Sequence, residues 1–233
     1  MPHISFSYSI TKDINNWIRR FYDQENASFV PTDDIIKKYP PALLVKIKGA
    51  KNRKEADNVV HDYLQNDLKN GKKMPLIKQE LKAARGAWKL RENDFFAVLQ
   101  NLLEKPIYTE EFNAYLTTFF RCPYSENENW FMVNFWSSLP EQMTTVAHEI
   151  LHLQFLNQYR PLLENNGLNE NQIQNLKEAL TFILNEKEFF GILIKPDNGY
   201  PEHYKLRKRL KELWNQSKTF NQFLPEAIKI LKT

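Results

Sequence analysis

Two histidines and a glutamate have the residue types and the spacing of a metal site, in which the histidines bind the metal and the glutamate acts as a base. His148 and His152 are four residues apart, and Glu149 directly follows the first of them. On an α-helix, residues i and i+4 lie on the same face, so both imidazoles can bind one metal ion. Glu149 would point into the same site without binding the metal, where a carboxylate can take and return a proton. The spacing therefore predicts a metal-dependent reaction centre on a helix.

The residues around this motif indicate that helix clearly. Ser138 offers an N-cap, Pro140 occupies the first turn, where no backbone donor is needed, and Glu141 completes a capping box. The residues that recur along the buried side are Val146, Ile150, Leu153 and Leu156. Pro161 predicts the end of the helix, because a proline in a helix interior removes a hydrogen bond. The two histidines are thus expected in mid-helix.

The run from His148 to His152 resembles the active-site helix of the zincin metallopeptidases. Thr145, Ile150 and Leu151 match the wider zincin pattern, whereas Gln154 stands where that pattern prefers an apolar residue. The resemblance implies an α+β, mostly helical, zincin-like fold with a Zn2+ cofactor. It also implies hydrolysis of peptide bonds by a zinc-activated water, with the motif glutamate as general base. The match covers about ten residues directly, so it concerns the site more than the whole chain.

A third protein ligand is needed, because catalytic zinc takes three and leaves a fourth position open. The metzincin solution requires a later histidine, and the corresponding position is Gln158. The gluzincin solution is a glutamate on a later helix. In the helix predicted over 169–190, Glu178 forms a polar stripe with Thr181 and Asn185 in an otherwise apolar stretch. A buried carboxylate needs a partner, so Glu178 is the predicted third ligand. The alternatives are Glu186, Glu188 and Asp197.

Three more residues bear on the chemistry. Peptide deformylases complete the same motif with an upstream cysteine, and Cys122 lies upstream of His148, but the sequence around it does not match that family. We therefore interpret Cys122 as a small packed residue. The turn 197–204 carries Tyr200 and His203. Gluzincins use tyrosine and histidine to stabilise the tetrahedral oxyanion, so the resemblance nominates both as further catalytic residues.

Hydrophobic periodicity predicts the elements that must position these residues. The predicted elements are a strand over 4–10, a helix from Thr11 to Phe21, a helix start at 31–34, helices over 55–68, 75–91, 95–103, 204–214 and 225–231, and a β-hairpin of 115–120 with 130–136. The hairpin leads into the motif helix. The resemblance implies that the second strand of the hairpin forms the rim of the substrate cleft, where an extended substrate could pair with it as an additional strand. The basic residues of 207–211 are interpreted as a solvated face. A soft boundary separates a helical region, 1–105, from a catalytic region, 106–233, which together could form one domain.

Composition limits the class of protein. The chain has 233 residues, 42% of them hydrophobic, and a net charge of +4, which is too mildly basic to indicate nucleic acid. One cysteine excludes an internal disulfide, and the absence of a signal peptide or membrane segment predicts a cytoplasmic protein. The expected partner is a peptide or protein substrate, with the oligomeric state left open. The competing class is a non-catalytic zincin-fold peptide-binding or regulatory protein with a structural or vestigial metal site.

Overall fold

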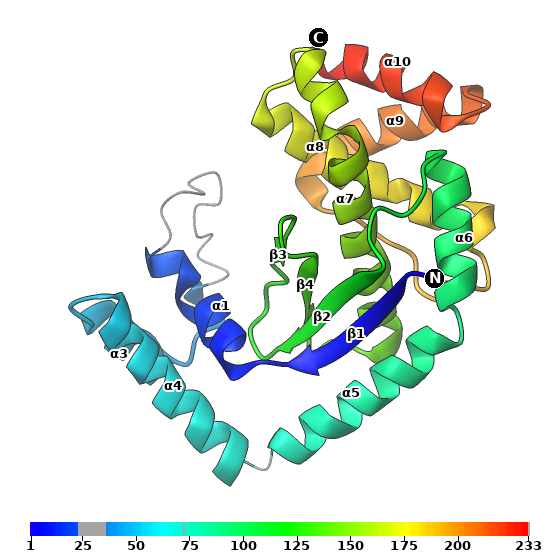
Figure 1. Cartoon of the computed structure of the whole chain (residues 1–233). Helices are drawn as coiled ribbons and strands as arrows, with labels where there is room; N and C mark the ends of the chain where they lie inside the picture. The colour runs from blue at the N-terminus through cyan, green and yellow to red at the C-terminus, as the bar shows by residue number, and fades with distance from the viewer. Residues whose placement is uncertain (23–35, 72, 233) are drawn as a thin grey trace.

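A small mixed sheet lies at the centre of the molecule (Figure 1). The computed structural model describes residues 1–22, 36–71 and 73–232. The four strands have the order β1-β2-β4-β3, with bounds β1 His3–Tyr8, β2 Glu111–Thr117, β4 Trp130–Asn134 and β3 Tyr124–Ser125. β1 and β2 run parallel, as do β2 and β4, whereas β3 is antiparallel to β4. Ala114 of β2 pairs with Phe6 on one side and with Phe131 on the other. The α+β, mostly helical class is thus confirmed.

The predicted hairpin of 115–120 with 130–136 is wrong, because these two segments run parallel. Alternation of apolar residues indicates a strand but not its direction, and the connection over 118–129 is long enough for the chain to return to the same end of the sheet. The antiparallel partner of β4 is β3, which lies between the two segments of the predicted hairpin. β4 is therefore an inner strand, and the edge beside it belongs to β3.

Helices surround this sheet and account for most of the chain. Their bounds are α1 Ile10–Tyr22, α3 Pro41–Gly49, α4 Arg53–Asn70, α5 Lys73–Lys89, α6 Glu92–Leu103, α7 Leu139–Asn165, α8 Glu170–Leu180, α9 Tyr204–Gln216 and α10 Phe220–Lys232. The first strand and the helices predicted over 55–68, 75–91, 95–103 and 204–214 are confirmed to within a few residues. The helix predicted over 225–231 is present but begins earlier, at Phe220, so that Pro225 lies inside it. The helix start predicted at 31–34 lies outside the described residues.

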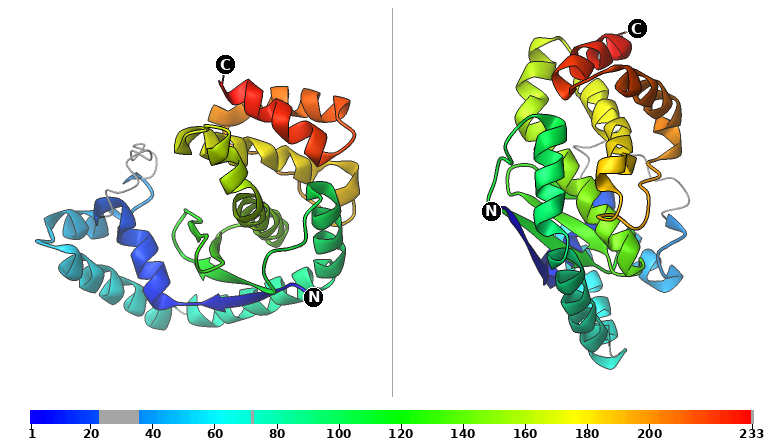
Figure 2. Two further views of the ribbon diagram at one scale, coloured as in Figure 1. Left: turned by 45° about the horizontal axis from the view of Figure 1, so that its top comes forward. Right: turned by 90° about the vertical axis from the view of Figure 1, so that its right-hand side faces the viewer.

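The helices divide into two groups around the sheet. α1, α3 and α4 extend from one end of it, while α6, α8, α9 and α10 gather around α7 (Figure 2). α7 packs against β4, and α5 packs against β1. The predicted regions 1–105 and 106–233 share this sheet, because β1 pairs with β2. They also share one hydrophobic core, in which Phe6, Trp88, Phe112 and Phe155 are all buried.

The helix that carries the histidine motif is longer than predicted. α7 continues through Pro161 to Asn165, so the predicted end at Pro161 is wrong. Pro161 is exposed, and its neighbours Tyr159 and Leu163 are buried in the core. Burial of these side chains outweighs the single backbone hydrogen bond that the proline removes.

The helix predicted over 169–190 is shorter than expected. α8 ends at Leu180, and the chain continues in two 3-10 turns, Thr181–Asn185 and Lys187–Phe189. The backbone N–H of Thr181 donates to the carbonyl of Glu178, three residues earlier, as in a 3-10 turn.

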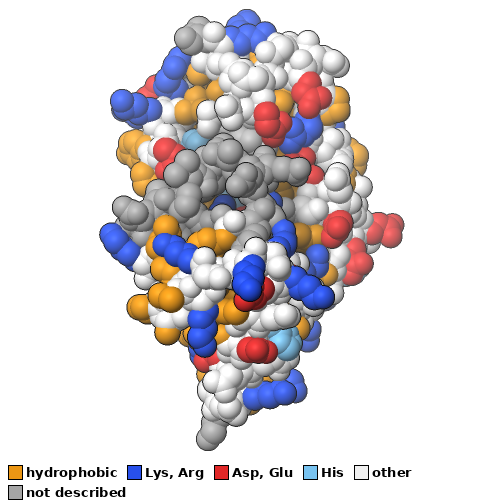
Figure 3. Space-filling view, turned by 90° about the vertical axis from the view of Figure 1, so that its left-hand side faces the viewer, with side chains coloured by type: hydrophobic (Ala, Val, Ile, Leu, Met, Phe, Trp, Pro, Cys, Tyr) orange, Lys and Arg blue, Asp and Glu red, His pale blue; other side chains and the backbone are white. Residues whose placement is uncertain are grey.

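No helix within residues 1–22, 36–71 and 73–232 has both the length and the hydropathy of a membrane span. On the face shown in Figure 3, lysine and arginine side chains are interspersed with acidic and hydrophobic ones.

Candidate metal centre

The α7 helix brings three motif side chains into one buried place. His148, Glu149 and His152 are 8%, 5% and 1% exposed. The ring centroids of His148 and His152 are 4.1 Å apart, as expected for positions i and i+4. The start of the helix is set by the carboxylate of Glu141, which accepts hydrogen bonds from the backbone and the hydroxyl of Ser138.

Glu178 approaches both histidines from α8. Its Oε2 lies 3.5 Å from Nε2 of His148 and 3.5 Å from Nε2 of His152. One possible ligand atom from each of the three residues lies within 4.8 Å of the others. Among the described residues, no other group of three histidine, cysteine, aspartate or glutamate side chains meets this condition. The structure therefore brings together the two motif histidines and the predicted third residue.

Several buried polar atoms at this point have no hydrogen-bond partner. They are Oε2 of Glu149, Nδ1 and Nε2 of His152, and Oε2 of Glu178. Buried polar groups are almost always paired, so unpaired atoms gathered in one place require an explanation. A dication between the two Nε2 atoms and the Glu178 oxygen would supply a partner for two of these atoms, Nε2 of His152 and Oε2 of Glu178. Two imidazoles and one carboxylate are a donor set that zinc accepts, and they leave a fourth position open.

Asp197 lies behind His148 and contacts its other ring nitrogen. Its Oδ2 is 2.7 Å from Nδ1 of His148, so Nε2 of the same ring points toward Glu178. A carboxylate on the second nitrogen fixes the tautomer and the orientation of a metal-binding histidine. Asp197 is thus placed to orient His148, whereas the sequence indicates Asp197 as an alternative third ligand.

The remaining alternatives for the third ligand lie elsewhere. Glu186 forms an ion pair with Lys211, and Glu188 is exposed. Neither belongs to the cluster of His148, His152 and Glu178.

A buried network holds the Asp197 carboxylate in place. Its Oδ1 accepts hydrogen bonds from the Thr181 hydroxyl and from the Arg207 guanidinium, each at 2.8 Å. The Asn185 side chain bonds to the backbone N–H and C=O of Asp197. The polar stripe predicted on Glu178, Thr181 and Asn185 therefore faces the site with all three members.

Arg207 does not lie on a solvated face, as the sequence predicts for the basic residues of 207–211. The structure buries Arg207, with 9% exposure, and brings it into contact with Asp197. The approach of its side chain depends on Gly199, which has a φ of +62° and whose Cβ, if present, would lie 2.9 Å from the guanidinium. One cation among the four basic residues of 207–211 carries no local sign of burial, so sequence reasoning missed this contact.

The charges around the site shift the pKa values in opposite directions. Burial alone would lower the pKa of His148, but the contacts with Asp197 and Glu178 raise it to about 10. Burial would raise the pKa of Glu178, but His148 and the Lys177 charge lower it to about 2. Burial raises the pKa of Glu149 to about 7, with the neighbouring carboxylates adding to the effect. A carboxyl group with a pKa near neutrality suits both halves of a proton transfer.

The pKa of the second histidine, His152, shifts in the opposite direction to that of His148. Burial, together with the positive charges of Lys177 and His148, lowers the pKa of His152 well below its ordinary value. His152 is therefore neutral in this structure, which is the form that binds a metal.

Tyr200 and His203 lie beside the cluster without belonging to it. The Tyr200 ring centroid is 6.4 Å from that of His148 and 6.5 Å from that of His203. About half of Tyr200 is exposed, and partial burial of its phenol, with the charges of Glu149 and Glu178, raises the pKa of Tyr200, so its phenol stays protonated. Cys122 is partly buried, and burial raises the pKa of its thiol to about 12.

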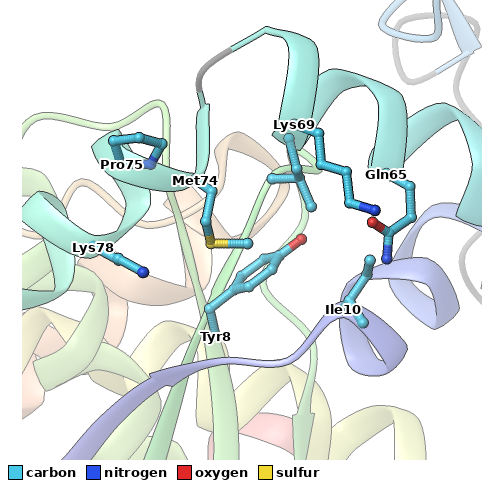
Figure 4. Close-up of a pocket in the computed structure, with 8 residues that line it drawn as sticks. Tyr8, Ile10, Gln65, Lys69, Met74, Pro75 and Lys78 are labelled. Atoms are coloured by element: carbon cyan, nitrogen blue, oxygen red, sulfur yellow. The ribbon is translucent and has the colours of Figure 1, made fainter.

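A pocket with a volume of about 660 Å³ lies at the junction of β1, α4 and α5 and shares no residue with the metal centre. Figure 4 shows Tyr8 and Met74 side by side in it, with Lys69 and Lys78 at its sides. The Tyr8 hydroxyl is already bonded to Asp13, at 3.0 Å. The lining residues include no histidine, cysteine, aspartate or glutamate, so this pocket has none of the side chains that most often bind a metal.

No protein-family model, no curated protein and no solved structure matches this chain. The geometry of the cluster is therefore the basis for interpreting what the protein does.

Proposed function

We propose that the chain is a zinc-dependent, gluzincin-like metallopeptidase with a zincin-like fold. The observation that carries the proposal is the convergence of three potential ligand atoms at one buried point. These atoms are Nε2 of His148, Nε2 of His152 and Oε2 of Glu178. A zinc ion held there would lower the pKa of a water molecule toward neutrality and polarise a carbonyl group.

The side chains around the zinc position have distinct proposed roles. Glu149 receives a proton at Oε2, a buried atom without a hydrogen-bond partner, and returns it to the leaving amine. Tyr200 is the proposed donor to the developing oxyanion, because its phenol stays protonated and its ring lies beside His148. His203, next to Tyr200, is the second candidate for this role. Asp197 keeps His148 in the tautomer that presents Nε2.

An extended peptide is the proposed substrate, bound by addition to the sheet. β3 lies at the edge of the sheet and next to the cluster. The ring centroid of its Tyr124 is 6.1 Å from that of His152. A peptide paired with β3 would lie beside the motif helix. β4 does not offer this edge, because it already pairs with β2 on one side and β3 on the other.

The competing class is a non-catalytic protein with a structural metal. Structural zinc is usually closed by four protein ligands, whereas the cluster found in the described part of the chain has three. Oε2 of Glu149 lies 3.7 Å from Nδ1 of His152, too far for a hydrogen bond, and so remains available as a proton acceptor. The three-ligand cluster and this available carboxylate favour the enzyme.

A Glu149→Gln variant tests the proposal. We expect zinc content equal to that of the unaltered protein and a loss of peptide hydrolysis of about 100-fold or more, because only the proton acceptor is removed. Hydrolysis is followed with a quenched fluorescent peptide library, and zinc by elemental analysis. The matched control is Glu164→Gln, an exposed glutamate on the same helix. The proposal fails if the protein binds no zinc, or if Glu149→Gln hydrolyses peptides at the unaltered rate.

A further inference from the structure

The two oxygens of the Glu178 carboxylate have different neighbours. Oε2 faces the Nε2 atoms of both histidines, at 3.5 Å. Oε1 is 2.8 Å from Nζ of Lys177, the residue that precedes Glu178 in the chain. The Lys177 side chain is only 3% exposed. A cation is therefore buried directly against the side of Glu178 that faces away from the metal position.

Lys177 is held in this place from a second side. Its Nζ donates to the Tyr124 hydroxyl at 3.0 Å and lies 4.6 Å from the centroid of that ring. The Tyr124 hydroxyl in turn donates to Oε1 of Gln174, at 3.3 Å. Burying an ammonium group is costly unless it is paired and hydrogen-bonded. The carboxylate of Glu178 and the phenol of Tyr124 provide that pairing, so the position of Nζ is well determined.

We propose that Lys177 is a positioning residue that keeps Glu178 a one-oxygen ligand. This inference rests on the metal site proposed above. A carboxylate can offer a metal one oxygen or both, and an ammonium bonded to Oε1 competes with the second mode. Two-oxygen binding by Glu178 would add a fourth protein donor atom to the metal and crowd the position that a catalytic site leaves open. Lys177 thus preserves the open position while acting only through Glu178.

The arrangement also connects the metal ligand to the edge of the sheet. Tyr124 belongs to β3, the proposed rim strand, and Lys177 belongs to α8. The chain of contacts from Tyr124 through Lys177 to Glu178 therefore links the orientation of the ligand to the strand that would receive the peptide.

Cobalt substitution gives the first test, because the visible bands of Co2+ report the number and geometry of its ligands. We expect Lys177→Met to lose about half the band intensity, because release of Oε1 raises the coordination number of the metal. The matched control is Lys229→Met, which removes an exposed lysine paired with Glu226 on α10 and should leave the bands unchanged. A purely structural role for Lys177 would change the thermal midpoint but not the bands. Unchanged bands in Lys177→Met overturn the inference.

A measurement on the unaltered protein keeps the test valid if Lys177→Met does not fold. In the zinc-loaded crystal structure we expect one Glu178 oxygen at about 2.0–2.2 Å from the metal and the other still bonded to Lys177. Two Glu178 oxygens on the metal would overturn the inference. A protein that binds neither zinc nor cobalt would overturn the proposed function as well, whereas bound metal with two-oxygen Glu178 would overturn the role of Lys177 alone.

Discussion

Replacing Asp197 by asparagine should weaken zinc binding by reversing the tautomer of His148. The Asp197 Oδ1 accepts hydrogen bonds from Thr181 and Arg207, so the amide oxygen of an asparagine must take that side. The amide nitrogen then faces Nδ1 of His148, now 2.7 Å from Oδ2. Nδ1 must become an acceptor, and the imidazole proton moves to Nε2. A neutral histidine with its proton on Nε2 cannot bind a metal through that atom.

The size of the effect follows from the burial of this contact. Loss of a carboxylate partner typically weakens metal affinity by about 10- to 100-fold, which is about 1.4–2.7 kcal/mol. We expect Asp197→Asn at the upper end of this range, because the asparagine stabilises the wrong tautomer as well as removing the charge. The fold should be less affected, by about 1–2 kcal/mol, because Arg207 keeps an oxygen acceptor.

The variant Asp197→Ala separates the effect on zinc affinity from the effect on the stability of the fold. It leaves the buried Arg207 guanidinium without its carboxylate partner and should destabilise the metal-free protein by about 3–5 kcal/mol. Zinc affinity is measured by competition with a chromophoric chelator, and stability by urea unfolding in the presence of a strong chelator. Our reasoning is refuted if Asp197→Asn binds zinc within twofold of the unaltered protein. It is equally refuted if alanine destabilises the metal-free protein no more than asparagine does.

Two further predictions concern buried groups away from the metal ligands. Asp13, 0% exposed, accepts hydrogen bonds from two hydroxyls of neighbouring threonines, one backbone N–H and the Tyr8 phenol. Asp13→Ala should therefore lower the free energy of unfolding by about 3–5 kcal/mol in urea titrations, whereas the exposed Asp62→Ala should change it by less than about 0.5 kcal/mol. Burial, with the Glu149 charge, raises the pKa of the Cys122 thiol to about 12. The reaction of Cys122 with a thiol reagent at pH 8 should thus be at least about 100-fold slower in the native protein than in urea. Equal rates in the two conditions would contradict the burial of this thiol.

The motif helix and the shared face of its two histidines could be predicted from sequence because they depend on local periodicity. Residues four apart on a helix must share a face, and a capping box marks where that helix begins. The same argument applies to the polar stripe that contains Glu178, since a carboxylate in an apolar helix has to find a partner inside the protein. The candidate ligands were therefore available before any tertiary contact was known, although their role in binding zinc stays a prediction.

Other features depend on contacts between distant segments, which no local pattern encodes. The parallel pairing of β2 with β4 depends on the path of the connection between them, while strand periodicity is the same in either direction. The continuation of α7 past Pro161 depends on what buries the neighbouring residues Tyr159 and Leu163.

By itself, the sequence determined that two imidazoles and a carboxylate would share the buried face of one helix and that an acid on a later helix would need a partner. Only the tertiary structure decided how these groups are held. Asp197 meets His148 across 49 residues of chain, and Arg207 reaches Asp197 from a different helix. Lys177 is buried against Glu178 because β3 covers it. The physical reason is that burial and charge pairing arise where elements pack, whereas the spacing of residues reports only the element to which they belong.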